Sequence, residues 1–197
     1  VFSDENQFIG TTVVEDSLQK RQLSSHPDIT VNGNLINNGW ICRGAIYTSY
    51  GIQIDLTGNL ENNGFFDVER LRFTGTQDQH LSSTQKGTEM DIDRILDTDP
   101  GSDVILDTDV NLIDCEIYLN ESTFQLNNAN LFMAGGQIRE GYLISQQNFI
   151  HLSQGAYIFR MHISDTHLKG DCHIMGDENH FGNVTVTDTL RNRDISG

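Results

Sequence analysis

The heptapeptide GNLINNG at residues 33–39 recurs as GNLENNG at residues 58–64, a displacement of 25 residues. An alternating, strand-like stretch precedes each copy, at residues 29–32 and 54–57. Self-similarity at a short period is typical of repeat architectures, in which each unit buries its apolar face against the next. The two copies therefore predict that the chain is built from stacked units.

Looser copies of the same pattern follow at residues 104–112 and 124–131. The central apolar residues of successive units are Val31, Leu56, Leu106, Leu126, Leu152, Leu168 and Val186. Their separations scatter around 20 residues, with one gap of 50 that holds either two units or one unit and an insertion. Such irregular spacing is typical of coils whose connecting loops differ in length.

Within each unit the apolar residues recur with a period of two. In residues 104–113, Val104, Leu106 and Val110 share one strand face, whereas Asp107 and Asp109 lie on the other. This alternation indicates strands with one buried face, and the abundant Gly, Asn and Asp supply turns between them. The fold class predicted is all-β: a right-handed parallel β-helix (β-solenoid) of about seven or eight coils over residues 29–197.

Stacked coils bring equivalent positions into vertical columns. Asn34 would then lie above Asn59, and Asn38 above Asn63, so that the side-chain amides form a hydrogen-bonded ladder as in other cross-β assemblies. The ladder explains the recurrent Asn without any functional site.

The two ends and one internal stretch depart from the pattern. Residues 1–28 are predicted to form an N-terminal cap with a short helix at 15–23, which ends at the polar stretch 24–27. The C-terminus has no comparable cap, and the chain begins with Val1 instead of Met, so we expect further coils of the same polypeptide or another subunit to cover the open edge. Residues 76–103 are predicted to be an irregular acidic insertion.

The composition limits the classes of partner. The chain of 197 residues has a net charge of −16, with 28 acidic residues against 12 Lys and Arg. This charge disfavours nucleic acids and anionic membranes. Direct membrane insertion is not expected either, because no run of about 20 apolar residues exists. The three cysteines are widely spaced and are interpreted as buried single thiols.

The densest acidic region suggests a cation site. Asp97, Asp99 and Asp103 place carboxylates around the Pro100–Gly101 turn with a spacing that calcium loops use. The remaining positions of an EF-hand are missing, so a solvated acidic edge is the competing interpretation. Calcium is thus the one cofactor that the sequence suggests.

Histidines and aromatic residues form two further groups. Five histidines fall late in the chain, without a metal-binding motif, and are interpreted as outward polar residues, with a transition-metal site as the alternative: His151, His162, His167, His173 and His180. Six aromatic residues fall in the first coils and are assigned to the core, with an exposed carbohydrate-stacking platform as the alternative: Trp40, Tyr47, Tyr50, Phe65, Phe66 and Phe73.

The GNLxNNG coils, the Asn-, Gly- and Thr-rich alternating strands and the acidic balance resemble the parallel β-helix regions of large secreted bacterial surface proteins, including adhesins and type IX secretion cargo of Bacteroidota. The resemblance covers about residues 29–190 and is one of repeat style. It implies an extended stalk or adhesive surface outside the cell, and no catalytic residues carry over. Pectin lyase-like enzymes share the architecture, but the Asn-Thr-Asp, Asp-Asp, Gly-His-Gly and Arg-x-Lys motifs of their hydrolase branch do not occur here.

We therefore expect a non-enzymatic structural or adhesive segment of an extracellular or cell-surface protein, which binds glycans or neighbouring subunits. The alternative is a glycan-active β-helix enzyme, either a polysaccharide lyase or a tailspike-like depolymerase. In that case carboxylates from residues 91–109 would act with an Arg or His on an adjacent coil.

Overall fold

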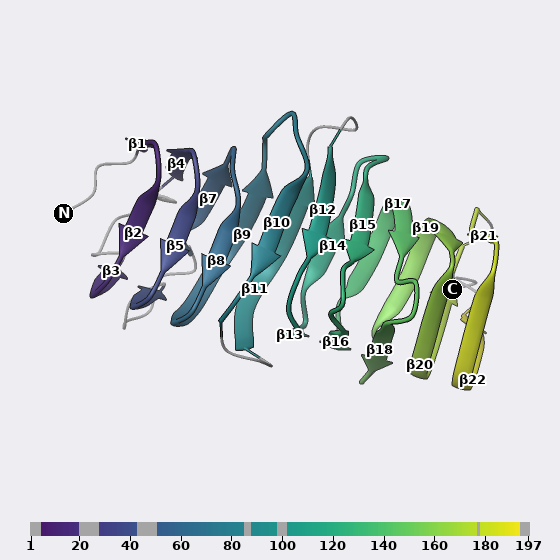
Figure 1. The fold of residues 1–197 in the computed structure, drawn as a ribbon. Coiled ribbons are helices and arrows are strands. Elements are labelled where there is room, and N and C mark those ends of the chain that lie inside the picture. Colours follow the sequence, from purple (N-terminus) through teal and green to yellow (C-terminus); the bar gives the residue numbers. More distant parts are fainter. Residues whose placement is uncertain are drawn as a thin grey trace.

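A computed structural model describes residues 5–19, 28–42, 51–84, 88–97, 102–176 and 178–193. The secondary structure in these ranges consists of strands and turns, and the strands lie side by side along a rod (Figure 1). Strands of successive turns pair in parallel. The described residues contain no helix of the length and apolarity that crossing a bilayer would need.

The strands form three columns, and each column contributes one side of every turn. Six long strands bend around a corner and so belong to two columns. The first column contains β1 (Glu5–Ile9), β4 (Asp28–Asn32), β7 (Gln53–Leu56), β14 (Glu116–Tyr118), the beginnings of β17 (Gln137–Ile144) and β19 (Tyr157–Ser164), and the ends of β9 (Phe65–Phe73), β11 (Thr88–Asp97), β20 (Thr166–Met175) and β22 (Val184–Arg193).

The second column contains β2 (Thr12–Val14), β5 (Leu35–Asn37), β8 (Leu60–Asn62), β10 (Gln79–Ser82), β12 (Asp103–Leu106), β15 (Thr123–Leu126), the ends of β17 and β19, and β21 (His180–Phe181). The third column contains β3 (Ser17–Gln19), β6 (Trp40–Cys42), β13 (Val110–Ile113), β16 (Leu131–Ala134), β18 (Phe149–Ser153), and the beginnings of β9, β11, β20 and β22.

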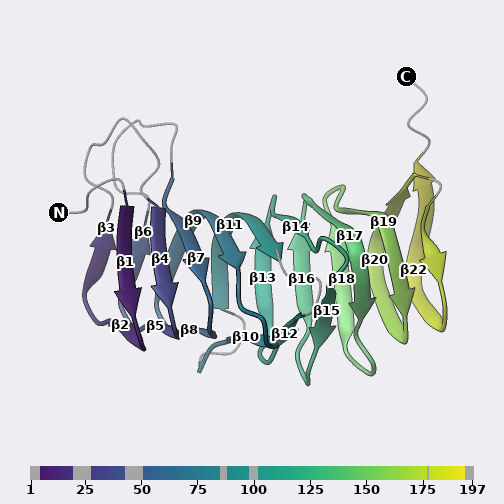
Figure 2. The ribbon, with the colours of Figure 1, turned by 90° about the horizontal axis from the view of Figure 1, so that it is seen from above.

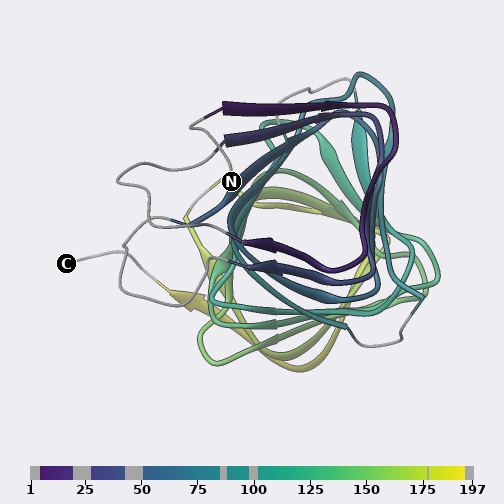
Figure 3. The ribbon, with the colours of Figure 1, turned by 90° about the vertical axis from the view of Figure 1, so that its left-hand side faces the viewer.

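The three columns enclose a common interior. Viewed from the N-terminal end, the chain runs clockwise as it recedes, which is the sense of a right-handed coil (Figure 3). Seen from above, the strands progress regularly along the axis from β1 to β22 (Figure 2). The alternation of the sequence matches this geometry, because every second side chain of a strand points inward.

The core is a set of apolar rows that run along the axis. One inward row of the first column has in-register partners on successive turns, each at most 8% exposed: Ile29, Ile54, Leu71, Ile95, Ile117, Ile138, Ile158 and Ile174. A second row follows the second column: Leu35, Leu60, Leu81, Leu106 and Leu126. Each row continues the dry interior from one turn to the next, so the β-solenoid prediction is confirmed.

The chain makes about eight turns of unequal length. In-register partners of the first column are 25 residues apart between Asp28 and Gln53, but only 16 apart between Tyr157 and His173. Loops at the corners absorb the difference, which is why the sequence period is irregular although the stack is continuous.

The predicted N-terminal helix is wrong for the part that is described. Residues 17–19 form β3, which pairs in parallel with Trp40–Cys42 of β6. Leu18 is the single apolar residue of β3, and it packs against the core as part of this strand. Pairing with the next turn satisfies the backbone of these residues, so no helix is needed. Residues 20–27 of the expected cap lie outside the described residues.

The acidic stretch at residues 76–103, predicted from the sequence to be an irregular insertion, contains the whole of β10 and β11. β10 pairs with β8 on one side and with β12 on the other, so it continues the second column. The alternation hidden among the acids is visible in Met90 and Ile92, both fully buried. The gap of 50 residues in the repeat pattern therefore spans two units.

Two glycines of the GNLxNNG repeat lie where the backbones of adjacent turns approach closely. A Cβ on Gly64 would overlap the carbonyl oxygen of Gly39, and a Cβ on Gly58 would overlap that of Gly33. The obstacle is backbone in both cases, so it cannot rotate away. The repeat thus requires glycine to let consecutive corners stack.

We predict that Gly64→Ala lowers the free energy of unfolding by about 1–3 kcal/mol, because the added methyl forces two stacked turns apart. Urea unfolding followed by circular dichroism measures the change. Gly182→Ala is the matched control, since its nearest neighbour would be the Cβ of Ser164 at 3.3 Å. Equal stability of Gly64→Ala and wild type would contradict the close approach.

Candidate functional site

The four repeat asparagines lie as vertical neighbours. The backbone N–H of Asn59 donates to Asn34 Oδ1 at 2.9 Å, and Asn63 Nδ2 donates to Asn38 Oδ1 at 3.0 Å. The ladder continues to the next turn, where the backbone N–H groups of His80 and Thr84 donate to Asn59 Oδ1 and Asn63 Oδ1. Asn34, Asn59 and Asn63 therefore each accept a backbone N–H of the following turn, whereas Asn38 accepts the side-chain amide of Asn63.

A second Asn pair lies inside the solenoid and is not anticipated by the sequence analysis. Asn37 and Asn62 are fully buried, and Asn37 Nδ2 donates to Asn62 Oδ1 at 2.7 Å. The same Nδ2 also donates to the carbonyl oxygen of Phe65 at 2.9 Å. Stacking gives Asn37 Nδ2 and Asn62 Oδ1 the partners that buried amides need, whereas Asn62 Nδ2 is buried without a hydrogen-bond partner among the described residues.

The three aspartates of the calcium hypothesis are only partly described. Asp97 ends β11, but its side chain and Asp99 lie outside the described residues. Asp103 begins β12, and its Oδ1 accepts the backbone N–H of Thr123 at 3.2 Å. In the described parts of the chain, no three His, Cys, Asp or Glu side chains converge on a point where a metal could bind. Calcium binding at these residues stays a prediction.

Outward rings of the last turns stack on histidines one turn away. On the third column the ring centroids of Phe132 and His151 are 5.8 Å apart, and those of Phe149 and His167 are 5.6 Å apart. Four of the five late histidines take part in such stacks. The exception is His173, which belongs to the first column and lies 3.3 Å from Asp171.

The longest of these stacks is on the second column. The ring centroids of Tyr142 and His162 are 4.9 Å apart, and those of His162 and His180 are 4.6 Å apart with nearly parallel planes. The three rings form one wall of an open hollow of about 640 Å³, which we call the corner groove. Its lining is Asn120, Glu121, Glu140, Gly141, Tyr142, Arg160, His162, Glu178 and His180.

Charged side chains form the other wall of the corner groove. Three carboxylates, those of Glu121, Glu140 and Glu178, outnumber the guanidinium of Arg160, which contacts Glu178 at 3.1 Å. Glu140 accepts from Arg139 at 2.8 Å. The groove therefore combines the edges of stacked rings with hydrogen-bond acceptors, and it carries net negative charge.

Three of these charged residues sit on left-handed backbone. The φ angles are 71° at Glu121, 58° at Glu140 and 51° at Arg160. A side chain other than Gly, Asn or Asp costs about 1–2 kcal/mol in this conformation. The next turn has Gly176 at this corner, with a φ of 81°. The chain thus presents charged side chains at positions where glycine would be less strained.

A second hollow, of about 390 Å³, lies among the earlier turns of the second column, and we call it the His80 hollow. It is lined by Asn34, Leu35, Ile36, Asn59, Glu61, His80, Ser82 and Asp107. His80 Nδ1 lies 2.6 Å from Asp107 Oδ2 on the following turn. The sequence alone places Asp107 on the outer strand face but does not point to His80. The two residues are 27 positions apart, and they meet only through the register of the stacked strands.

The outer face of the first column carries ion pairs that join successive turns. Arg72 Nε donates to Asp55 Oδ1 at 2.8 Å, and Glu116 lies between two arginines, 3.4 Å from Arg94 and 2.6 Å from Arg139. The guanidinium of Arg139 also lies over the ring of Tyr118 at 4.3 Å, and hydrogen bonds to Glu116 and Glu140 raise its pKa against the opposing effect of burial. Most described arginines are engaged in this way.

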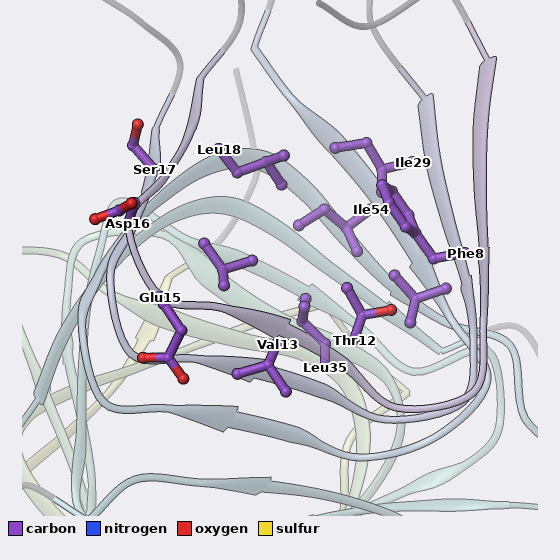
Figure 4. Close-up of a pocket in the computed structure, with 12 residues that line it drawn as sticks. Phe8, Thr12, Val13, Glu15, Asp16, Ser17, Leu18, Ile29, Leu35 and Ile54 are labelled. Carbon is purple, nitrogen blue, oxygen red and sulfur yellow. The ribbon is translucent and has the colours of Figure 1, made fainter.

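At the N-terminal end the interior opens into a hollow of about 290 Å³ (Figure 4). Phe8 and Leu18 border it, and Leu35 and Ile54 of later turns line its floor (Figure 4). Glu15 and Asp16 lie at its rim. This opening is apolar because it is an end of the core.

The six early aromatic residues divide between core and surface. Phe66 and Phe73 are fully buried, as predicted, whereas Trp40 and Phe65 are exposed and stack at 5.2 Å on the third column. The remaining two, Tyr47 and Tyr50, lie outside the described residues. Period-two alternation places neighbours such as Phe65 and Phe66 on opposite faces.

The cysteines are free, and two of them are buried. Burial raises the pKa of the Cys115 thiol far above its usual range, with the nearby carboxylates of Asp93 and Glu116 adding to the effect. Burial also raises the pKa of Cys172 to about 11. Cys42 is half-buried.

We predict that iodoacetamide at pH 8 labels Cys42 in the native protein before it labels Cys115 or Cys172. The thiolate is the reactive form, and a thiol with a pKa of about 11 is only about one part in a thousand thiolate at this pH. Peptide mass spectrometry after timed labelling measures the order. In concentrated urea the three rates should converge, and equal rates in the native protein would contradict the burial.

Comparison of the chain with protein-family models, with curated proteins and with solved structures finds no match.

Proposed function

We propose that the chain is a structural and adhesive segment of an extracellular or cell-surface protein, and that its corner groove binds a glycan without cleaving it. The observation that carries this proposal is the wall of stacked rings, Tyr142, His162 and His180, which lines the same groove as three carboxylates. The continuous apolar core and the inter-turn ion pairs support the role of a rigid scaffold.

The groove has the two kinds of group that sugar recognition uses. The CH-rich face of a pyranose ring packs on an aromatic face, and Tyr142, which ends the stack and is 45% exposed, has one face that no other ring of the stack covers. Sugar hydroxyls donate to carboxylates, which are ionised at neutral pH and then act solely as hydrogen-bond acceptors. Further sugar units along the stack would contact ring edges, because the rings cover one another's faces.

The charge of the groove selects among glycans. Glu140 pairs with Arg139 and Glu178 with Arg160, and Glu121 adds a third carboxylate, so the groove keeps a net negative charge that disfavours an anionic chain such as a polyuronate. Neutral sugars avoid this repulsion. We therefore propose neutral glycans as the ligand class.

The open edges account for the second kind of partner. β1, β2 and β3 each pair with a strand on one side, and the apolar hollow lies at this end. Unpaired strand edges recruit other strands. We propose that further coils of the same polypeptide or a neighbouring subunit cover such an edge.

We predict that Tyr142→Ala weakens the binding of a neutral oligosaccharide about tenfold, because the ring that begins the wall is lost. Isothermal titration calorimetry against a panel of neutral oligosaccharides and oligogalacturonate measures the affinity. Phe149→Ala is the matched control, since Phe149 is 40% exposed and also stacks on a histidine, but on the third column. Tightest binding to oligogalacturonate, or binding unaffected by Tyr142→Ala, would contradict the proposal.

A glycan-active enzyme is the second candidate, and the carboxylates of the groove favour it. The backbone N–H of Glu121 donates to the carbonyl of Glu140, so the two residues lie on adjacent turns, with strands about 4.8 Å apart. Glycosidases use two carboxyl groups about 5–9 Å apart, which this spacing can supply. A lyase acting on uronates fits less well, because Arg160 is paired with Glu178.

We predict that no glycan of a panel of neutral and uronate polysaccharides yields new reducing ends or unsaturated products, with or without calcium. Reducing-end assays and absorbance of unsaturated uronates measure turnover. If products form and disappear in Glu121→Gln or Glu140→Gln but persist in Glu15→Gln, at the opposite end of the rod, the enzyme candidate replaces the first proposal.

A further inference from the structure

The His80 hollow contains a histidine whose orientation is fixed by two other turns. His80 Nδ1 lies 2.6 Å from Asp107 Oδ2, and Asp107 Oδ1 accepts from Asn127 Nδ2 at 2.8 Å. The carboxylate holds the proton of a neutral imidazole on Nδ1, so the lone pair is on Nε2, on the far side of the ring. This is the arrangement of a general base with its orienting group.

A hydroxyl lies on the same strand face as this base. Ser82 follows His80 by two residues in β10, so both side chains point outward, with Cα atoms about 6.6–6.8 Å apart. Ser82 Oγ contacts the carbonyl oxygen of Leu60 at 3.4 Å, the long end of the hydrogen-bond range. A hydroxyl held this weakly can turn toward His80 Nε2.

The same hollow contains amide donors. Asn34 Oδ1 and Asn59 Oδ1 both accept a backbone N–H of the following turn, which fixes the orientation of each side-chain amide. Neither Nδ2 group has a hydrogen-bond partner among the residues that the structure describes, and both residues line the hollow. Oriented amide N–H groups are the donors that stabilise an oxyanion.

We propose that the His80 hollow is an acyl-transfer site that hydrolyses carboxylic esters, with Ser82 as nucleophile, His80 as base, Asp107 as its positioning residue, and Asn59, on the turn next to Ser82, as oxyanion donor. This activity goes beyond the proposed glycan binding and does not depend on it. The substrate class is an ester of a small acyl group, since the hollow is open and holds about 390 Å³.

The reaction transfers the acyl group first to Ser82 and then to water. Ser82 Oγ bonds to the acyl carbon while its proton passes to His80 Nε2. The carbonyl oxygen becomes an oxyanion that accepts from the side-chain amide of Asn59. The carbon–oxygen bond to the alcohol breaks, and the alcohol leaves with the proton from Nε2. Water then attacks the acyl-Ser82 carbon, gives a proton to Nε2, and releases the carboxylic acid as Ser82 recovers its proton.

The position on the second column connects the two proposals. The corner groove lies on later turns of the same column as β10, so a chain bound along this face would pass both places. An ester carried by a glycan is one substrate that this geometry accommodates. Probes that contain no sugar, such as a simple aryl ester, measure the esterase activity independently of glycan binding.

We predict that p-nitrophenyl acetate is hydrolysed by the full chain and that Ser82→Ala and His80→Gln each lower the rate at least about 100-fold. Asp107→Asn should lower it at least about tenfold, because the orienting charge is lost. Diisopropyl fluorophosphate should phosphorylate Ser82 with release of fluoride, detected by peptide mass spectrometry.

Ser164→Ala is the matched control, because Ser164 is a half-buried serine at the end of β19 on the same column. Urea unfolding of each variant separates loss of activity from loss of fold, and Ser82→Ala removes only a weak contact. Hydrolysis that persists in Ser82→Ala, or labelling of Ser82 no faster than in urea-unfolded protein, would overturn the proposal. Glycan binding with no esterase activity would overturn this inference alone.

Discussion

Parallel, in-register pairing of each turn with the next is the constraint on which the rest of the structure depends. Strands about 4.8 Å apart must place like residues above one another, or the interior would contain polar groups without partners. The row that begins with Ile29, Ile54 and Leu71 satisfies this requirement in the first column. Where a polar residue does face inward, as Asn37 does, it hydrogen-bonds to the asparagine stacked on it in the next turn, Asn62.

The same constraint organises the outer surface. A side chain that points outward on one turn has an outward neighbour on the next, so attractive pairs become rows: arginines with carboxylates on the first column, and rings with histidines on the second and third. The corner groove and the His80 hollow are both products of this stacking. The contacts between turns in these two places join residues 18 to 27 positions apart in sequence, such as His162 with His180 and His80 with Asp107.

The fold was predictable from the sequence because its signal is local and repeated. The GNLxNNG copies, with glycines that allow close backbone approach at Gly58 and Gly64, are sufficient to indicate stacked coils. The acidic stretch at 76–103 obscured two strands, because its apolar residues, such as Met90 and Ile92, are separated by charges. The short segment at 17–19 looked helical by composition, but pairing with β6 outweighed that weak propensity.

By itself, the sequence determined the period-two alternation, the coil architecture and the Asn34–Asn59 and Asn38–Asn63 columns, because these follow from neighbouring residues and from an exact repeat. Only the tertiary structure decided which side chains of different turns meet. The contacts of His80 with Asp107, and of Tyr142 with His162 and His180, depend on loop lengths, which make the sequence separation of stacked positions differ from turn to turn. No local pattern encodes those lengths, so the chemistry of the outer face emerges only when the coils are stacked.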